Sequence, residues 1–208
     1  MIDADEIVRI MVSGEALKML ERSGWILADV SAERRESVAE HSYGVILTSL
    51  LIAQCMLKER REINLEKILI MATIHDIQES ITGDIPRTLE NEQNRRFMEQ
   101  KAKLEQDAIY KILGGPNRQY SSLYKLWMEY CDVKSIESRI VRGADILDMI
   151  LHARKLESDA QQSQKLEQFF QSGKNVVEQL NVQEITEIFN ILSKNRQGTS
   201  VTTSDKKK

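Results

Sequence analysis

Two of the three histidines in this 208-residue chain stand where helix packing would favour apolar residues. His75, followed directly by Asp76, ends a segment over 68–74 that is apolar on every side. Burying an unpaired imidazole and carboxylate there would cost several kcal/mol. His41 and Asp145 likewise interrupt the apolar faces of two other expected helices. One divalent metal ion would satisfy all four side chains, because imidazole nitrogen and carboxylate oxygen together suit Mn, Co, Fe, Ni or Zn.

Each of these residues also has a simpler structural explanation. A single core histidine is more often hydrogen-bonded within the protein than bound to a metal, and a His-Asp dipeptide alone is weak evidence. Asp145 lies three residues after Arg142 and can form an ion pair with it on a helix. Taken one by one, the residues therefore leave the metal site open.

The composition predicts a helical scaffold for these residues. Leu, Ile, Glu, Lys, Gln and Met are abundant, aromatic residues make up 5%, and there are two prolines. Unbranched side chains favour helices, whereas strands favour aromatic and β-branched ones. We therefore expect an all-α, single-domain protein, with apolar spacing that predicts helices at about 119–131, 135–157, 160–172 and 182–194.

The first half of the chain carries clearer helix boundaries. Ser37 and Glu40 form a capping box, which predicts a helix from there to about Lys58. Before it, the pattern predicts a helix broken near Ser13-Gly14 and a loop over 23–36.

The segment that ends in the His-Asp pair is expected to be a central buried helix. Asn64 is its predicted cap, the helix should reach Ile81, and Gly83 and Pro86 should end it. A long polar helix over 89–113 should follow, ended by the Gly-Gly-Pro at 114–116.

The ordered set of a histidine, a His-Asp pair and a distant aspartate resembles the signature of the HD-domain phosphohydrolases. The segments 36–42 and 75–86 are similar to the motifs of the 5′-deoxynucleotidase-like branch, including the Gly-Asp-Ile-Pro turn. The gaps of 34 residues from His41 to His75 and 69 from Asp76 to Asp145 suit that branch. The similarity extends from about residue 22 to residue 157. It implies an HD-domain helical bundle over 1–196, and 197–208 reads as a disordered tail.

The resemblance implies a role for each matching residue. His41, His75, Asp76 and Asp145 would hold one divalent metal ion. Glu79 looks like the catalytic acid/base of the family, and a carboxylate beside a metal ion can pass a proton to a leaving alkoxide. Its alternative is a surface glutamate.

Four residues are implied to handle the substrate. Asp84 resembles a catalytic-site residue that contacts the substrate sugar, Arg22 one that binds phosphate, and Trp25 one that lies beside the sugar and base. Arg142 could assist phosphate binding, its alternative being an ion pair with a glutamate. Ser23 and Gly24 separate Arg22 from Trp25, whereas the family can carry the two adjacent. This spacing leaves the choice between ribo- and deoxyribonucleotides open.

The third histidine, His152, is expected to stay outside the metal site. It follows Asp145 by seven residues, which is two helical turns and roughly 10 Å of rise. We therefore predict a structural or interface role for it.

Charge and cysteine content narrow the class of protein. The net charge is −3, and it is −5 over 1–196, because the last twelve residues hold three lysines and one aspartate. This body has no broad attraction for long nucleic acids, although a local pocket for a small anion is compatible with it. No apolar run reaches the roughly 18 residues of a membrane helix, and the N-terminus is acidic, unlike a signal peptide. Cys55 and Cys131 read as reduced core thiols of a cytoplasmic protein.

The predicted function is that of a metal-dependent phosphohydrolase releasing phosphate from nucleoside or deoxynucleoside 5′-monophosphates. Its cofactor would be one divalent metal ion (Mn, Co, Ni, Fe or Zn), its partner a small phosphorylated substrate, and the resemblance implies a homodimer. Three alternatives stay open: an HD hydrolase of another phosphorylated metabolite or nucleotide polyphosphate, a non-catalytic metal-stabilised regulatory protein, and a helical partner-binding protein without metal.

Overall fold

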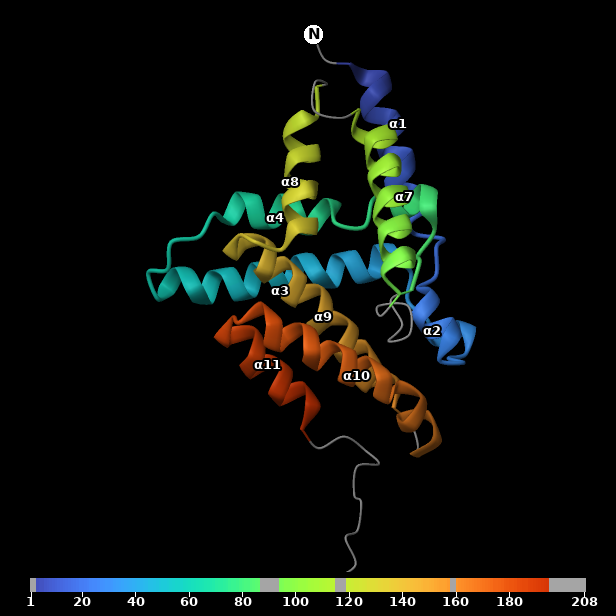
Figure 1. Cartoon of the computed structure of the whole chain (residues 1–208), viewed down its shortest axis with the longest axis vertical. Helices are drawn as coiled ribbons and strands as arrows, with labels where there is room; N and C mark the ends of the chain where they lie inside the picture. The colour runs from blue at the N-terminus through green and yellow to red at the C-terminus, as the bar shows by residue number, and fades with distance from the viewer. Residues whose placement is uncertain (1–2, 87–93, 115–118, 158–159, 195–208) are drawn as a thin grey trace, which may run out of the picture.

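A computed structural model describes residues 3–86, 94–114, 119–157 and 160–194 of the chain, and these residues form helices joined by short loops without a regular strand (Figure 1). The all-α expectation is therefore confirmed. The helices are α1 (Ala4–Ala16), α2 (Ser23–Leu27), the 3-10 helix η1 (Ala32–Arg34), α3 (Val38–Lys58), α4 (Leu65–Ile74), α5 (Glu79–Thr82), α7 (Arg95–Leu113), α8 (Ser121–Asp132), α9 (Ile136–Leu156), α10 (Ala160–Leu180) and α11 (Gln183–Ser193).

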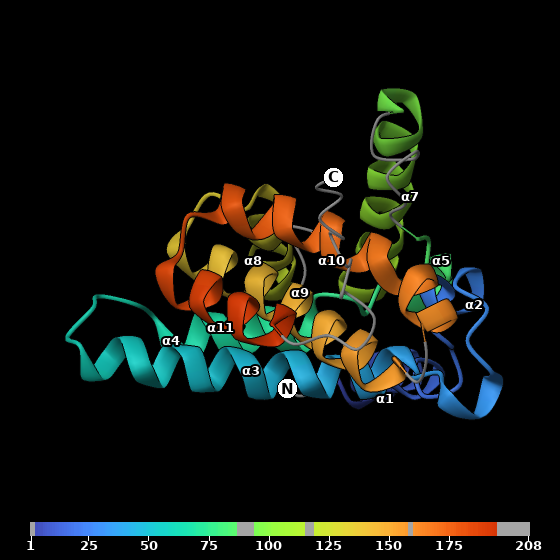
Figure 2. The same cartoon turned by 90° about the horizontal axis from the view of Figure 1, so that it is seen from below.

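Helix α9 forms the centre of the molecule. It packs against α3, α4 and α8 and is covered by α10 and α11 (Figures 1 and 2). Buried side chains of α9 such as Ile140, Leu147 and Ile150 meet those of α3 such as Val45 and Ile52 in the main core. Because the core surrounds α9, polar side chains on that helix are held in fixed positions.

A smaller core lies between α4, α7 and α8. Its buried members are Ile74, Ile109, Ile112, Leu113 and Trp127. Helix α7 extends away from the main bundle in Figure 2, and α1 packs beside α7, as Figure 1 shows. The two cores meet at the end of α4, where the His-Asp pair is located.

The predicted helix boundaries with a local chemical cause are confirmed. The Ser37 hydroxyl accepts a hydrogen bond from the Glu40 backbone at 3.2 Å, and the Glu40 carboxylate accepts one from the Ser37 backbone at 2.7 Å. The Asn64 side chain caps α4 by accepting from the Lys67 backbone at 3.0 Å. Gly114, with a left-handed φ of 80°, ends α7. The capping box places His41 in the first turn of α3.

Three further expectations are wrong. Helix α1 continues through Ser13-Gly14, because a glycine inside a helix costs only about 1 kcal/mol relative to alanine. The expected loop over 23–36 contains α2 and η1. The cysteines at 55 and 131 are exposed rather than buried in the core.

The buried helix ends at Ile74, not at Ile81. His75 is its C-cap, a turn follows, and α5 begins at Glu79. The Trp127 indole N–H donates to the His75 carbonyl at 3.2 Å and to the Gln78 side chain at 3.0 Å. The Glu79 backbone N–H bonds to the Asp76 carbonyl instead. A tertiary hydrogen bond from α8 therefore replaces one that the helix would make.

The C-terminal helices agree with expectation except in length. Helix α10 continues to Leu180 rather than ending near 172. Gly173 explains how it can: a Cβ there would lie 3.2 Å from Ile146 and Ile150, so the bare glycine allows α10 to approach α9 closely. The start of the expected helix over 89–113, the break at 115–116 and the tail over 197–208 lie outside the described residues.

Candidate active site

Three predicted metal ligands come together from three different helices. His41 lies in the first turn of α3, His75 caps α4, and Asp145 lies in the middle of α9. One ligand atom of each lies within 4.8 Å of those of the other two, and all three residues are buried. The His41 Nε2 and the Asp145 Oδ1 are 3.2 Å apart. These atoms surround a point that a single cation could occupy.

The second nitrogen of each histidine is held by the protein. His41 Nδ1 lies 2.8 Å from the Asp148 carboxylate, and His75 Nδ1 lies 2.8 Å from the Ala72 carbonyl. A metal-bound histidine usually donates its other N–H to such a carboxylate or carbonyl, which fixes the ring and its tautomer. Both Nε2 atoms are thereby directed to the common point.

His75 Nε2 is buried without a hydrogen-bond partner among the described residues. The Asp76 carboxylate lies 3.1 Å from it and 3.9 Å from His41 Nε2, but outside hydrogen-bonding geometry. A buried nitrogen with no partner is costly in free energy, and a metal ion would satisfy it. The donor set therefore fits a divalent metal.

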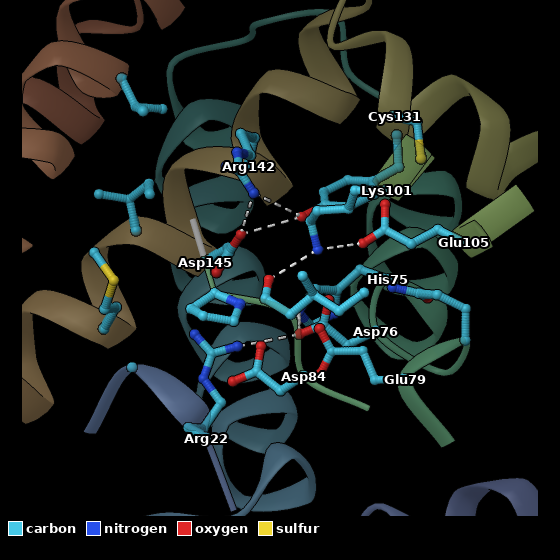
Figure 3. A pocket seen from close by; sticks show the side chains of 18 of the residues that line it. Arg22, His75, Asp76, Glu79, Asp84, Lys101, Glu105, Cys131, Arg142 and Asp145 are labelled. Carbon is cyan, nitrogen blue, oxygen red and sulfur yellow. Dashed lines mark hydrogen bonds and ion pairs between the residues drawn. The ribbon is translucent and has the colours of Figure 1, made fainter. Parts of the chain in front are cut away.

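Two arginines accompany the acidic ligands from opposite sides (Figure 3). The Arg142 Nη1 lies 2.6 Å from Asp145, and the Arg22 Nη1 lies 3.5 Å from Asp76. Burial alone would raise the pKa of both carboxyls. Arg142 together with His41 outweighs it at Asp145, and His75 together with Arg22 outweighs it at Asp76, so both pKa values fall below the ordinary range.

The pKa of His41 is also changed by its surroundings. Burial and the nearby Arg22 lower its pKa, but hydrogen bonds to Asp145 and Asp148 outweigh them and raise the pKa of His41 to about 9. The metal-free site therefore carries a proton on an imidazole that a metal ion would displace, since a histidine ligand must be neutral.

Glu79 is a buried carboxyl group that stays protonated in the metal-free protein. It begins α5, and its Oε2 is buried without a hydrogen-bond partner among the described residues. Burial, and then the carboxylates of Asp76 and Asp84, raise the pKa of Glu79 to about 10. A carboxyl group in this state can donate a proton inside the cavity.

Asp84 lies in the turn after α5 and is hydrogen-bonded to Ser23 of α2. Its Oδ2 accepts hydrogen bonds from the Ser23 backbone at 2.6 Å and from the Ser23 hydroxyl at 2.9 Å. Lys101 of α7 donates to the Ile85 carbonyl at 2.9 Å and to Glu105 at 2.6 Å. The turn is thus attached to both α2 and α7.

Most of these groups line one cavity of about 460 Å³. Arg22, His75, Asp76, Glu79, Asp84, Arg142 and Asp145 line it, and Figure 3 shows them converging on its centre. Apolar side chains of α9 and α10 line the same cavity. Its volume suits a small organic phosphate.

Trp25 borders the cavity, but its side chain is almost completely buried in the protein interior. The residue is 1% exposed, and its indole N–H donates to Glu36 at 3.1 Å. Its ring packs against Phe169, with 4.6 Å between centroids, and against His152, with 5.0 Å. The substrate contact expected of Trp25 stays a prediction.

His152 lies in this network, apart from the metal ligands. Its Nδ1 lies 3.4 Å from Glu36 and its Nε2 lies 3.2 Å from the Arg34 carbonyl. The arrangement agrees with the structural role expected from its spacing after Asp145.

Three site residues escaped the sequence reasoning. Asp148 follows Asp145 by three residues, a spacing that could have placed it on the same face of α9. Tyr130, whose hydroxyl donates to Asp145 at 3.2 Å, and Lys101 carry no such signal, because only the tertiary fold brings them to the site.

The helical fold and the ordered histidine and aspartate cluster define a protein of the HD domain class. The sequence model of the HD domain family matches residues 14–186, and the chain belongs to this family. It is 33% identical over 162 residues to a Dictyostelium discoideum protein named 5′-deoxynucleotidase HDDC2, covering 75% of this chain and 82% of that protein. The human protein of the same name is 31% identical over 157 residues, with 75% and 71% covered.

Solved structures are similar over most of the chain. A crystal structure of a Pyrococcus horikoshii OT3 protein matches with a TM-score of 0.71 and 31% identity, covering 89% of this chain and 97% of that one. A predicted metal-dependent phosphohydrolase from Magnetospirillum magnetotacticum MS-1 shares the fold, with a TM-score of 0.60 and 21% identity over 90% and 94% of the two chains. In the described part of this chain, no helix is long and apolar enough to span a membrane.

Proposed function

We propose that this protein is a metal-dependent phosphohydrolase that releases phosphate from nucleoside or deoxynucleoside 5′-monophosphates. One observation carries the proposal: His75 and Asp145, which form a buried cluster with His41, line the same cavity as a protonated Glu79 and two arginines. The relatives named 5′-deoxynucleotidases support the choice of substrate class.

The proposed metal ligands are His41, His75, Asp76 and Asp145. A mixed nitrogen and oxygen donor set suits Mn, Co, Ni, Fe or Zn. When bound, the metal ion would polarise the phosphoryl oxygen and lower the pKa of water.

The chain's own residues would bind the phosphate and move the proton. Arg22 and Arg142, already facing the carboxylates from opposite sides, would bind the phosphate oxygens and neutralise their charge. Asp84, with Oδ2 held by Ser23, would present its other oxygen to a sugar hydroxyl.

Glu79 would act as acid and then as base. It donates its proton to the 5′ oxygen as the bond from that oxygen to phosphorus breaks. Water supplies the hydroxyl group that phosphorus gains, and its proton restores Glu79. The products are a nucleoside and inorganic phosphate. A site that served only stability would have no use for a buried, unpartnered carboxyl group at this position, which favours catalysis over the regulatory alternative.

The direct test measures phosphate release from a panel of ribo- and deoxyribonucleoside monophosphates with several metals. Glu79→Ala should lower kcat by at least about a hundredfold, the range for loss of a general acid or base. Glu99→Ala, an exposed glutamate on α7, is the matched control and should keep full activity. Equal activity of Glu79→Ala would remove Glu79 from this role, and activity on other phosphate esters alone would favour the first alternative substrate class.

Metal content is a separate test of the proposal. Protein purified without chelators should hold close to one divalent ion per chain by elemental analysis. Absence of a stoichiometric ion would overturn the metal-dependent mechanism.

We further propose that the protein is a cytoplasmic homodimer. The location is supported by two cysteines that are too few for a disulfide framework. Helix α1 supports an interface, because it has no buried residue and exposes Val8, Met11 and Val12. Helix α9, in contrast, is surrounded by neighbouring helices. Sedimentation equilibrium should give twice the chain mass, and Met11→Glu should shift it toward a monomer.

A further inference from the structure

One wall of the cavity is apolar and lies next to the phosphate-binding groups. Met149 follows Asp145 by one turn of α9 on the same face. Phe169 and Val176 of α10 also line the cavity and are seven residues apart, so they share a face of that helix. All three side chains are only partly buried. The cavity therefore offers an apolar surface beyond its charged centre.

Phe169 supplies the aromatic surface of this wall. Its ring packs on that of Trp25 with an interplanar angle of 33°, but Trp25 is 1% exposed and its N–H is bonded to Glu36. Phe169 keeps part of its surface accessible. The aromatic face open to a ligand thus belongs to α10 rather than to the loop before α3.

Three consecutive residues connect the charged centre to this wall. Arg22 lies 3.5 Å from Asp76, Ser23 bonds to Asp84, and Gly24 lies against Phe169, whose ring would be 3.2 Å from a Cβ at that position. The first partner, Asp76, is a proposed metal ligand beside the proposed phosphate position. The second, Asp84, is the proposed sugar contact, and the third, Phe169, is an aromatic ring. Phosphate, sugar and base follow one another in the same order along a nucleotide.

We propose that the wall formed by Met149, Phe169 and Val176 receives the nucleobase of the substrate, with Phe169 as the stacking partner. The inference rests on the proposed function and assigns the organic end of the substrate to α9 and α10. Every nucleobase has an aromatic face, and stacking on a protein aromatic ring strengthens binding without requiring a particular base.

Equilibrium binding separates the base from the rest of the substrate. Titration calorimetry would compare dAMP with 2-deoxyribose 5-phosphate, which keeps the phosphate and sugar but lacks the base. Glu79→Gln protein with Mn²⁺ would be used to slow turnover. We expect dAMP to bind at least about tenfold more tightly, in line with the strength of one base stack. Phe169→Ala should remove most of this difference by weakening dAMP.

Two further variants complete the test. Phe169→Leu keeps apolar bulk but lacks the ring, and it should also weaken dAMP selectively. Gln171→Ala, an exposed position on the same helix, is the matched control and should leave both affinities unchanged. Equal binding of the two ligands, or an equal loss of both in Phe169→Ala and Phe169→Leu, would overturn the base site.

The outcome is independent of whether the proposed function is correct. If the unmodified protein releases phosphate from no nucleoside monophosphate of the panel, the proposed function fails, and the affinities still decide whether the wall binds a base. If it hydrolyses both with equal KM and the affinities are equal, the proposed function stands and the base site is overturned.

Discussion

At the scale of single residues, the orientation of His41 depends on the absence of a side chain at Gly44. The Asp148 carboxylate that holds His41 Nδ1 at 2.8 Å passes close to Gly44 of α3. A Cβ on Gly44 would overlap that carboxylate, with Asp148 Cγ only 2.6 Å away. Glycine at this position therefore lets a carboxylate of α9 reach behind a histidine of α3.

Gly44→Ala should weaken metal binding without touching any ligand. The methyl group would displace Asp148, and loss of such an orienting partner typically lowers metal affinity by about 10- to 100-fold. Competition titration with Mn²⁺ or Zn²⁺ measures the affinity directly. Gly14→Ala is the control, because a Cβ there meets nothing within 4 Å. Unchanged affinity in Gly44→Ala would show that Asp148 does not orient His41.

Glu79 should make the stability of the metal-free protein depend on pH. Its folded-state pKa of about 10 lies above its ordinary value of 4.5, so the unfolded chain gives up this proton first as the pH rises. The free energy of unfolding should therefore fall between pH 4.5 and pH 10. Urea unfolding of metal-free protein at pH 6 and pH 8.5 measures the change. Glu79→Gln should reduce the loss at the higher pH, and an identical loss would contradict a protonated Glu79.

The ordered ligand motif allowed most of the site to be predicted residue by residue. His41, His75 and Asp145 each stand where an apolar residue would be expected, but it was the resemblance of their order to the HD-domain signature that joined them into one ligand set. The fold brings them together. Lys101 could not be predicted, because a lysine in a polar helix gives no sign that it bends back to the Ile85 carbonyl. Trp25, in contrast, was predicted to contact the substrate, but its position in the motif gives no sign of the packing that buries it.

At the scale of elements, a hydrogen bond from α8 decides where α4 ends. The Trp127 indole N–H occupies the His75 carbonyl, which a continuous helix would pair with the backbone of Glu79. The resulting turn separates His75 and Asp76 from Glu79 and changes the direction in which Glu79 points. The end of α4 therefore sets the positions of both the proposed metal ligands and the proposed catalytic acid.

Trp127→Phe should destabilise the protein and disturb the site. It removes the donor to His75 and Gln78 while keeping an aromatic ring in the small core. A buried carbonyl left unpaired typically costs about 1–3 kcal/mol. Urea unfolding should show a loss in this range, together with weaker metal binding. Tyr110→Phe, on an exposed ring, should change stability by less than about 0.5 kcal/mol.

Element prediction succeeded where the cause is local and failed where it is tertiary. The caps at Ser37 and Asn64 were predicted because side chain and backbone partners are three residues apart. The end of α4 depends on Trp127, some fifty residues away, so no window of sequence contains it. The length of α10 likewise depends on the fit of Gly173 against α9.

At the scale of the whole molecule, the proposed metal ion would join elements that the core alone holds together. His41, His75 and Asp145 belong to α3, α4 and α9, which pack on one another around the main core. Without a metal ion, the Nε2 of His75 in this cluster is buried and has no hydrogen-bond partner in the described part of the chain. Binding of a metal ion by these three residues should therefore stabilise the packing of the three helices that carry them.

Removal of the metal ion should lower the melting temperature of the whole chain. A ligand at about 100 times its Kd stabilises the folded state by about 2.7 kcal/mol, and a domain of this size shifts by about 2–4 °C per kcal/mol. Calorimetry before and after chelation should therefore show a fall of roughly 5–10 °C, reversed when the metal ion is restored. His75→Ala should make the melting temperature insensitive to metal, whereas His152→Ala, outside the ligand cluster, should keep the response. Equal melting temperatures for chelated and metal-loaded wild-type protein would contradict a metal site that links α3, α4 and α9.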